Sequence, residues 1–244
     1  MMRGAWCVEQ TWRDMMMVHW RADPNKLARH VPNKLQLDLF DGHAYVSAVL
    51  FAVDPFRLRG MPAVRGMRRF WQLNLRTYVR CGATPGVYFL RLDTSRAWPA
   101  QLGRLTYALP FERAEMAVLE DREHLAVGVV SRTGDKASLS VGFRRAGHRM
   151  PWYEPMEGSL DAWLLNRYTL FATAFGVVVE TRVVHKPWVV QPAEARVGDA
   201  RMLAPYGCEE MAFACAAETR TARIGLPHPA RHPTHSPDSR SLAR

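Results

Sequence analysis

Short runs of β-forming residues, separated by turn signals, most strongly limit the folds open to this chain. The run at 71–80 alternates apolar and polar side chains with the two-residue period of a strand. Asp41-Gly42 separates two β-rich runs, 35–40 and 43–53, which is a strong hairpin signal. Helix signals are few and short. The pattern therefore predicts a mainly β (α+β) protein, an antiparallel barrel or sandwich with short helices as plugs.

Three places carry helix signals. Asp23 is a good N-cap, Pro24 suits the first helical position, and Pro32 is expected to end that helix. Ser95 and Ser159 are expected to begin two further short helices. Between the helices, further strands are predicted at 13–20, 87–93, 112–119, 123–132, 137–145, 177–184, 189–190 and 211–217.

Two stretches read as neither helix nor strand. Residues 54–69 are rich in Pro, Gly and Arg, which predicts a surface loop that could serve as a lid. From Arg220 the sequence consists mainly of Pro, His, Ser and Arg with almost nothing apolar. Such a segment cannot bury enough surface to order itself. We therefore expect one folded domain at 1–219, followed by a disordered tail at 220–244.

Composition is that of an ordinary globular protein, with 48% hydrophobic and 23% charged residues. No apolar run approaches the ~18 residues of a membrane span, and the N-terminus lacks the apolar segment of a signal peptide. The four cysteines, Cys7, Cys81, Cys208 and Cys215, are scattered without metal-ligand spacing. These features predict a cytoplasmic protein with free thiols and no bound metal.

The formal net charge of +10 raises the question of nucleic-acid binding. Its basic residues are spread along the chain rather than clustered, and no helix-turn-helix, zinc-finger or RNA-recognition signature is present. We interpret the charge as solvated surface arginine, with non-specific polyanion affinity as the alternative. Hydrolase, dinucleotide-binding and phosphate-loop motifs are also absent, so the sequence indicates no cofactor.

Short motifs follow one another in order along the chain, namely Trp12–Asp23 with His19-Trp20, Phe40-Asp41-Gly42, Leu73–Arg80, Gly86–Phe89, Gly158-Ser159-Leu160, Arg167-Tyr168, His185–Trp188 and Gln191–Glu194. This ordered set resembles the acetoacetate decarboxylase-like superfamily, and within it the YqjF-like family of uncharacterised proteins. The resemblance covers roughly residues 8 to 218 and implies a closed antiparallel β-barrel with a few short helices and an internal site.

The same resemblance argues against decarboxylase chemistry. The decarboxylase forms a Schiff base through a lysine whose pKa is lowered by an adjacent lysine. The matching frame here is Ala97–Gly103, in which Ala100 and Gln101 stand where the two lysines belong. The strand that should carry a supporting acidic residue, Ala44–Ala48, has none. We therefore predict that the chain does not decarboxylate acetoacetate through an imine.

Several residues are candidates for binding a ligand. Arg13 falls where the resemblance implies a pocket arginine, which suits a carboxylate; the alternative is an arginine at the barrel mouth in contact with solvent. Asn74, Arg76 and Tyr78 share one face of the strand at 71–80. That face is either a polar stripe inside the barrel or its solvated exterior. Arg91 suggests an internal charged site, although it could simply pair with a nearby aspartate.

His19 and His185 are the histidines of the folded region to consider. Either could act as a general base, or it could be a hydrogen-bonded structural residue. The leading hypothesis is a barrel that binds a small carboxylate or carbonyl compound, with no catalytic residue identified. The alternatives are a non-catalytic structural protein and a polyanion-associated protein. A homo-oligomer is compatible with each of these hypotheses.

Overall fold

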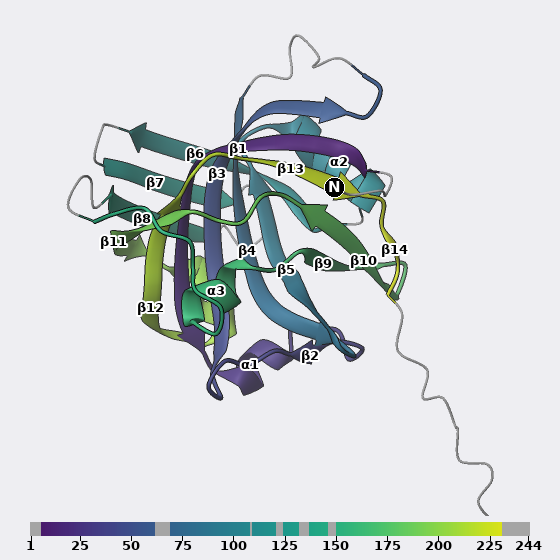
Figure 1. The fold of residues 1–244 in the computed structure, drawn as a ribbon, viewed down its shortest axis with the longest axis horizontal. Coiled ribbons are helices and arrows are strands. Elements are labelled where there is room, and N and C mark those ends of the chain that lie inside the picture. Colours follow the sequence, from purple (N-terminus) through teal and green to yellow (C-terminus); the bar gives the residue numbers. More distant parts are fainter. Residues whose placement is uncertain are drawn as a thin grey trace, which may run out of the picture.

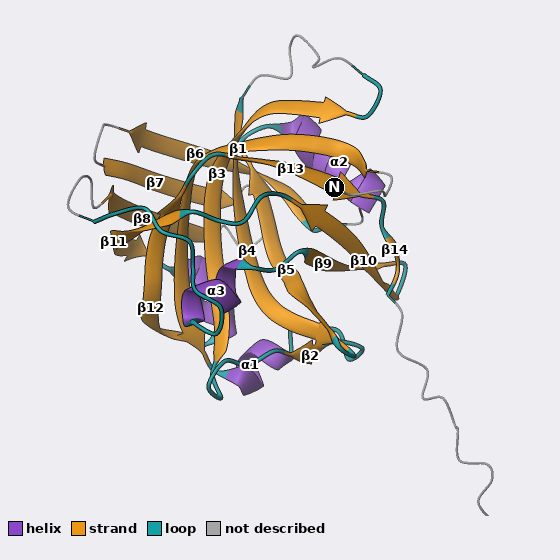
Figure 2. Ribbon diagram, in the orientation of Figure 1, coloured by secondary structure: helices purple, strands orange, loops and turns teal. Residues whose placement is uncertain are grey.

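The computed structural model describes residues 6–61, 69–107, 109–120, 124–131, 137–145 and 150–230. Strands dominate this part of the chain, and short helices lie at its periphery (Figures 1 and 2). The helices are α1 (Pro24–Ala28), α2 (Ala97–Tyr107), α3 (Leu160–Leu165) and a 3-10 turn at Arg201–Tyr206. The strands are β1 (Trp6–Ala22), β2 (Gln36–Leu37), β3 (Ala44–Leu58), β4 (Phe70–Cys81), β5 (Thr84–Thr94), β6 (Phe111–Glu120), β7 (His124–Ser131), β8 (Ser138–Arg145), β9 (Thr169–Ala174), β10 (Val177–Val184), β11 (Val190–Asp199), β12 (Cys208–Ala217), β13 (Arg220–Gly225) and β14 (His228–Pro229).

Strand pairing closes two rings that share β1, β3, β4 and β5. The first ring runs β1-β3-β4-β5-β9-β10-β13 and returns to β1. The second leaves β5 through β6, β7, β8, β11 and β12 before it returns to β1. The long shared strands lie between the two halves in Figure 1. The mainly β prediction is confirmed, but the pairings of β5 with β6 and with β9 are parallel, so the structure is not purely antiparallel.

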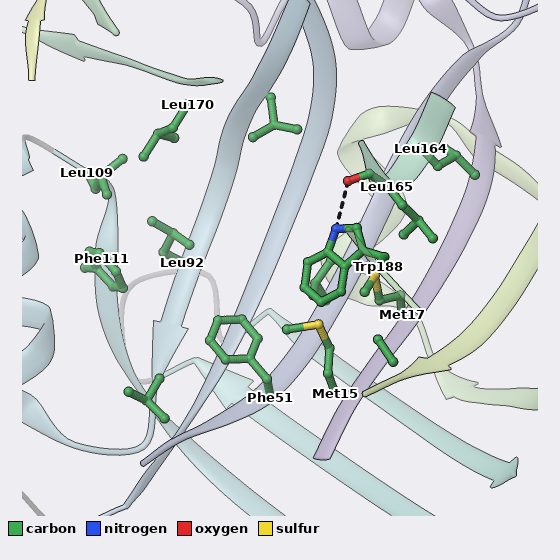
Figure 3. Packing of buried hydrophobic residues seen from close by; sticks show 14 of the residues in the cluster. Met15, Met17, Phe51, Leu92, Leu109, Phe111, Leu164, Leu165, Leu170 and Trp188 are labelled. Carbon is green, nitrogen blue, oxygen red and sulfur yellow. Dashed lines mark hydrogen bonds between the residues drawn. The ribbon is translucent and has the colours of Figure 1, made fainter. Parts of the chain in front are cut away.

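Because two rings share them, the central strands bury both of their faces. On β1, Met15 and Met17 point into the core of the first ring, and Met16 and Val18 into the core of the second. This explains why ten successive residues of β3, from Ala44, are all buried. Figure 3 shows part of the first core, where the Trp188 indole donates a hydrogen bond of 3.0 Å to a backbone carbonyl.

Local sequence signals place α1 and α3 correctly, whereas the Ser95 hydroxyl accepts a hydrogen bond from the Trp71 backbone N–H, and α2 begins at Ala97. The Asp23 carboxylate caps α1 by accepting hydrogen bonds from the backbone N–H groups of Asn25 and Lys26, at 2.8 and 3.3 Å. Ser159 caps α3 by accepting a hydrogen bond from the Ala162 N–H. The α1 helix ends at Ala28, earlier than the predicted stop at a proline.

Two loop predictions need correction. β3 continues to Leu58, so the loop expected at 54–69 begins later, and residues 62–68 lie outside the described part. Asp41 and Gly42 do form a tight turn with positive φ angles of 48° and 78°. The turn, however, closes only a single bridge, and β2 pairs with β4 rather than with β3.

The boundary expected at residue 220 is wrong. Arg220–Gly225 forms β13, which pairs with both β1 and β10 and closes the first ring. Ala222 is fully buried and Ile224 packs on the first core, so these two apolar residues anchor the strand in addition to its pairing with β1 and β10. The remainder of the predicted tail, from residue 231, lies outside the described residues.

Candidate ligand-binding cavity

A β-bulge in β1 decides which side chains of that strand enter the first ring. The pairing of β1 with β3 shifts between Arg13 and Met16, and Asp14 takes a positive φ of 50°. Trp12 consequently faces the interior, whereas the next residue, Arg13, is exposed and donates from Nε to the Asp54 carbonyl oxygen at 2.8 Å. The pocket position that the resemblance implied for Arg13 is therefore not where its side chain lies.

The polar face of β4 points into the first ring. Gln72, Asn74 and Arg76 line a cavity there, while Leu73 and Leu75 pack in the second core. The Gln72 side-chain N–H donates to the Asn74 carbonyl oxygen at 2.7 Å. This leaves the Asn74 amide N–H groups and the Gln72 carbonyl oxygen available to a ligand. The question that sequence alternation left open is thus settled geometrically, because both faces of β4 are buried.

Tyr78 lies further along β4, beneath two arginines, but it is fully buried and does not itself line the cavity. Its hydroxyl lies 2.6 Å from the Ser47 hydroxyl, which in turn lies 2.6 Å from His19 Nδ1. The guanidinium carbons of Arg76 and Arg167 lie 5.9 and 5.5 Å from the centre of the Tyr78 ring. The Ser47 hydroxyl and the His19 imidazole therefore fix the Tyr78 ring, and the guanidinium groups of Arg76 and Arg167 lie over this ring, called the platform below.

His19 is completely buried and does not line the cavity. Burial, followed by the positive charge of Arg76, lowers the pKa of His19 to about 3. Its imidazole is therefore neutral at physiological pH and serves as a fixed hydrogen-bonding partner for Ser47. Its Nε2 atom has no partner among the described residues.

Arg76 is the central charge of the cavity. Its Nε atom is buried without a hydrogen-bond partner, and no ion pair joins it to a described residue. After burial, which is the largest cause, its charge helps to lower the pKa values of His19 and His185, and it opposes the rise in the pKa of Cys215 that burial produces. A guanidinium that lines a cavity, is only partly exposed and has no counter-ion is suited to binding an anion.

Arg167, which follows α3, belongs to one of the family motifs, but no feature of the sequence marks it as a ligand-binding residue. Its Nε donates to the Trp163 carbonyl oxygen and its Nη1 to Asp38, at 2.7 and 2.6 Å. Its guanidinium also lies over the Trp163 ring at 4.2 Å. Asp38 is thus the partner of Arg167, with Arg80 3.5 Å from its other oxygen. No pattern in the sequence links positions 38 and 167.

The cavity has a volume of about 130 Å³, and its walls are mostly aromatic and aliphatic. Among its described lining residues there is no carboxylate and no lysine. The aromatic lining comes from several strands, from α2 and from the loop before β11, namely Trp12, Phe51, Phe56, Phe70, Phe89, Tyr107, Phe111 and Trp188.

His185 lies at the wall of the cavity, among aromatic rings. Its ring centre is 4.4 Å from that of Trp188 and 5.7 Å from that of Trp12, and its Nδ1 lies 2.7 Å from the Lys186 carbonyl oxygen. Burial lowers its pKa, despite the opposing effect of that hydrogen bond. Arg91, by contrast, is not a lining residue. It pairs with Asp93 and Glu112, each at 2.7 Å, as the simpler interpretation expected.

The positions that should carry the two lysines belong to α2, which covers one side of the cavity. Ala100 is buried in the first core and Gln101 is exposed. Lys26, Lys34 and Lys186 are exposed, and Lys136 lies outside the described residues. In the described ranges no cluster of His, Cys, Asp and Glu could hold a metal ion. Nor does any described helix have the length and apolarity needed to cross a membrane.

The double-ring architecture and its internal cavity define an acetoacetate decarboxylase-like fold. The enduracididine biosynthesis enzyme MppR in complex with pyruvate superposes with a TM-score of 0.66 at 10% identity, covering 95% of this chain and 93% of that one. Acetoacetate decarboxylase from Legionella pneumophila gives a TM-score of 0.66 at 10% identity, covering 93% of this chain and 88% of the enzyme. These identities are low, so the likeness concerns the fold.

The chain belongs to the DUF2071 family, whose model is described as "Uncharacterized conserved protein" and matches residues 9–223. It is 34% identical over 196 residues to the uncharacterized protein YqjF of Bacillus subtilis (strain 168), covering 80% of this chain and 79% of that protein. The resemblance drawn from the ordered sequence motifs is thereby confirmed.

Proposed function

We propose that this protein binds a small carboxylate or carbonyl compound in the cavity of the first ring, with Arg76 as the anchoring residue and without Schiff-base chemistry. The observation that carries the proposal is the Arg76 guanidinium, which lines the cavity and has no ion-pair partner among the described residues. A planar guanidinium donates two parallel hydrogen bonds to a carboxylate, which makes this pairing specific as well as strong.

Charge balance at the platform supports an anionic ligand. Two guanidiniums lie over Tyr78, but only Arg167 has a carboxylate partner, Asp38. Leaving a charge partly out of water without a partner is unfavourable, and a bound carboxylate removes that cost. The Asn74 amide is adjacent along the strand and offers donors to a second ligand oxygen, such as a carbonyl.

The lysine positions support binding without an imine. A nucleophilic amine must reach the ligand, whereas Ala100 has no amine, and Lys26, Lys34 and Lys186 are exposed. None of these three lysines lines the cavity. Reduction with borohydride in the presence of acetoacetate should therefore leave the intact mass of the protein unchanged. A reduced adduct on any lysine, accompanied by turnover, would overturn this part of the proposal.

The structural neighbours suggest which compounds to test first. One neighbour is described as complexed with pyruvate, and another as acetoacetate decarboxylase. Pyruvate, acetoacetate and acetate are accordingly suitable first probes for calorimetric titration of this protein.

A pair of arginine variants tests the anchoring role. Arg76→Gln keeps a polar side chain but removes the charge, and should weaken carboxylate binding by about 1.5–3 kcal/mol, roughly 10- to 150-fold. Arg13→Gln is the matched control, because Arg13 is an exposed arginine outside the cavity. Equal affinities for the two variants would refute Arg76 as the anchor, and a loss confined to Arg13→Gln would restore the role suggested by the sequence.

A further inference from the structure

We infer that the preferred ligand is a monocarboxylate that carries a single aromatic ring, such as benzoate. This inference rests on the proposed function, because it assigns the class of carboxylate to the site of Arg76. Three properties of the cavity carry it: its volume, the aromatic character of its walls, and its net charge.

The volume suits one ring. The cavity measures about 130 Å³, whereas sites for drug-sized ligands usually measure roughly 300–1,000 Å³. An apolar protein cavity of about 150 Å³ is known to accept benzene. An acetate or pyruvate molecule would leave much of the apolar space unfilled, and a two-ring compound would exceed it.

The walls suit a flat apolar group. The rings of Trp12 and Trp188 are stacked with centres 6.1 Å apart and planes only 14° from parallel. Phe51 approaches Trp12 at 5.5 Å, and His185 approaches Trp188 at 4.4 Å. Burial makes His185 harder to protonate, so this wall stays uncharged near neutral pH. Aromatic rings prefer offset or edge-on contacts with other rings at about these separations.

The charge limits the ligand to one carboxylate. Arg167 is already paired with Asp38 at 2.6 Å, whereas Arg76 has no ion-pair partner among the described residues. Gln72, Asn74 and Arg76 supply polar groups from the inner face of β4, while most of the remaining lining is apolar. A dicarboxylate would place its second charge against that apolar lining, which is strongly unfavourable.

Calorimetric titration of the full chain with matched ligands tests the inference. Benzoate should bind roughly 10- to 100-fold more tightly than acetate, because its ring leaves water. Benzamide has nearly the same shape without the charge and should bind at least about tenfold more weakly than benzoate. Phthalate, with two carboxylates on one ring, should also bind more weakly by at least about tenfold.

Two leucine variants on α2 test whether the aromatic ring of the ligand lies in the cavity. Leu102 lines the cavity, whereas Leu105, on the same helix, has a side chain that is 86% exposed. Leu102→Phe fills part of the cavity and should weaken benzoate roughly tenfold or more while acetate binding changes little. Leu105→Phe should change neither affinity. If neither variant affects benzoate, the ring does not occupy this cavity and the inference fails.

The ligand panel separates the two proposals. If acetate or pyruvate binds in an Arg76-dependent manner and benzoate does not bind more tightly, the aromatic inference fails and the proposed function stands. If benzoate and benzamide bind equally and Arg76→Gln has no effect, the cavity takes rings without an anion and the proposed function fails. If none of these compounds binds, both fail.

Discussion

His19 should make the folded protein sensitive to mild acid. Its side chain is fully buried, and burial together with the charge of Arg76 lowers its pKa to about 3 from an unfolded value of 6.5. The unfolded chain therefore binds a proton between these pH values that the folded chain does not bind. The stabilisation is complete above pH 6.5 and is lost as the pH falls toward 3.

The expected size follows from this shift. Each pH unit within the window corresponds to about 1.4 kcal/mol, so His19 should lower the free energy of unfolding by about 2 kcal/mol between pH 7 and pH 5. Carboxylates contribute little over this interval, since Glu9, for example, has an unfolded pKa of 4.5 and loses its stabilising effect only below it. The lowered pKa of His185 adds a contribution of the same sign.

Urea unfolding at pH 7 and pH 5 measures the effect. His19→Asn retains a hydrogen-bonding group for Ser47 but does not titrate, so the variant should lose about 2 kcal/mol less than the parent over the same interval. His43→Gln, a change at an exposed turn residue, is the control and should leave the pH dependence unchanged. The same pH dependence in His19→Asn and in the parent would refute the assignment of a neutral, buried His19.

Three further changes test the fold. Gly103→Ala would place a methyl carbon 2.2 Å from the ring of Phe111 and should destabilise the protein by about 1–3 kcal/mol in urea unfolding, whereas Gly128→Ala, with nothing within 4 Å, should not. Phe175 is fully exposed with a φ of 48°, so Phe175→Asn should increase the free energy of unfolding by up to about 1 kcal/mol and raise the melting temperature; a lower melting temperature would contradict this. Ending the chain before Arg220 removes β13 and should abolish cooperative unfolding, unlike a truncation that keeps β13 and β14.

Local patterns in the sequence were sufficient for most individual elements. β10 occupies the predicted range 177–184, and the caps at Asp23 and Ser159 act as expected. These features depend on residues that are close together in the chain, so the sequence of each segment is enough to predict them. The ordered motifs predicted the fold, because family likeness reflects the whole chain rather than any single segment.

Which residues line the cavity could not be predicted from the sequence, because it depends on contacts between segments that are far apart in the chain. Alternation could not show which face of β4 is internal, because sharing β4 between two rings buries both faces. A bulge near Asp14 reverses the alternation on β1 and turns Arg13 outward, although the sequence around it carries no bulge signal. The partnership of Arg167 with Asp38 joins residues 129 positions apart, beyond the reach of any local pattern.

The central claim is that a carboxylate binds directly to Arg76 inside the first ring. The Nε–H group of Arg76 has no hydrogen-bond partner among the described residues, so its nuclear magnetic resonance signal reports directly on a bound anion. That signal can be identified as the one missing from an Arg76→Lys spectrum. On titration with sodium benzoate and sodium pyruvate, we predict a downfield shift that saturates with the dissociation constant found by calorimetry. Binding heat without any shift of the Arg76 signal would contradict the claim.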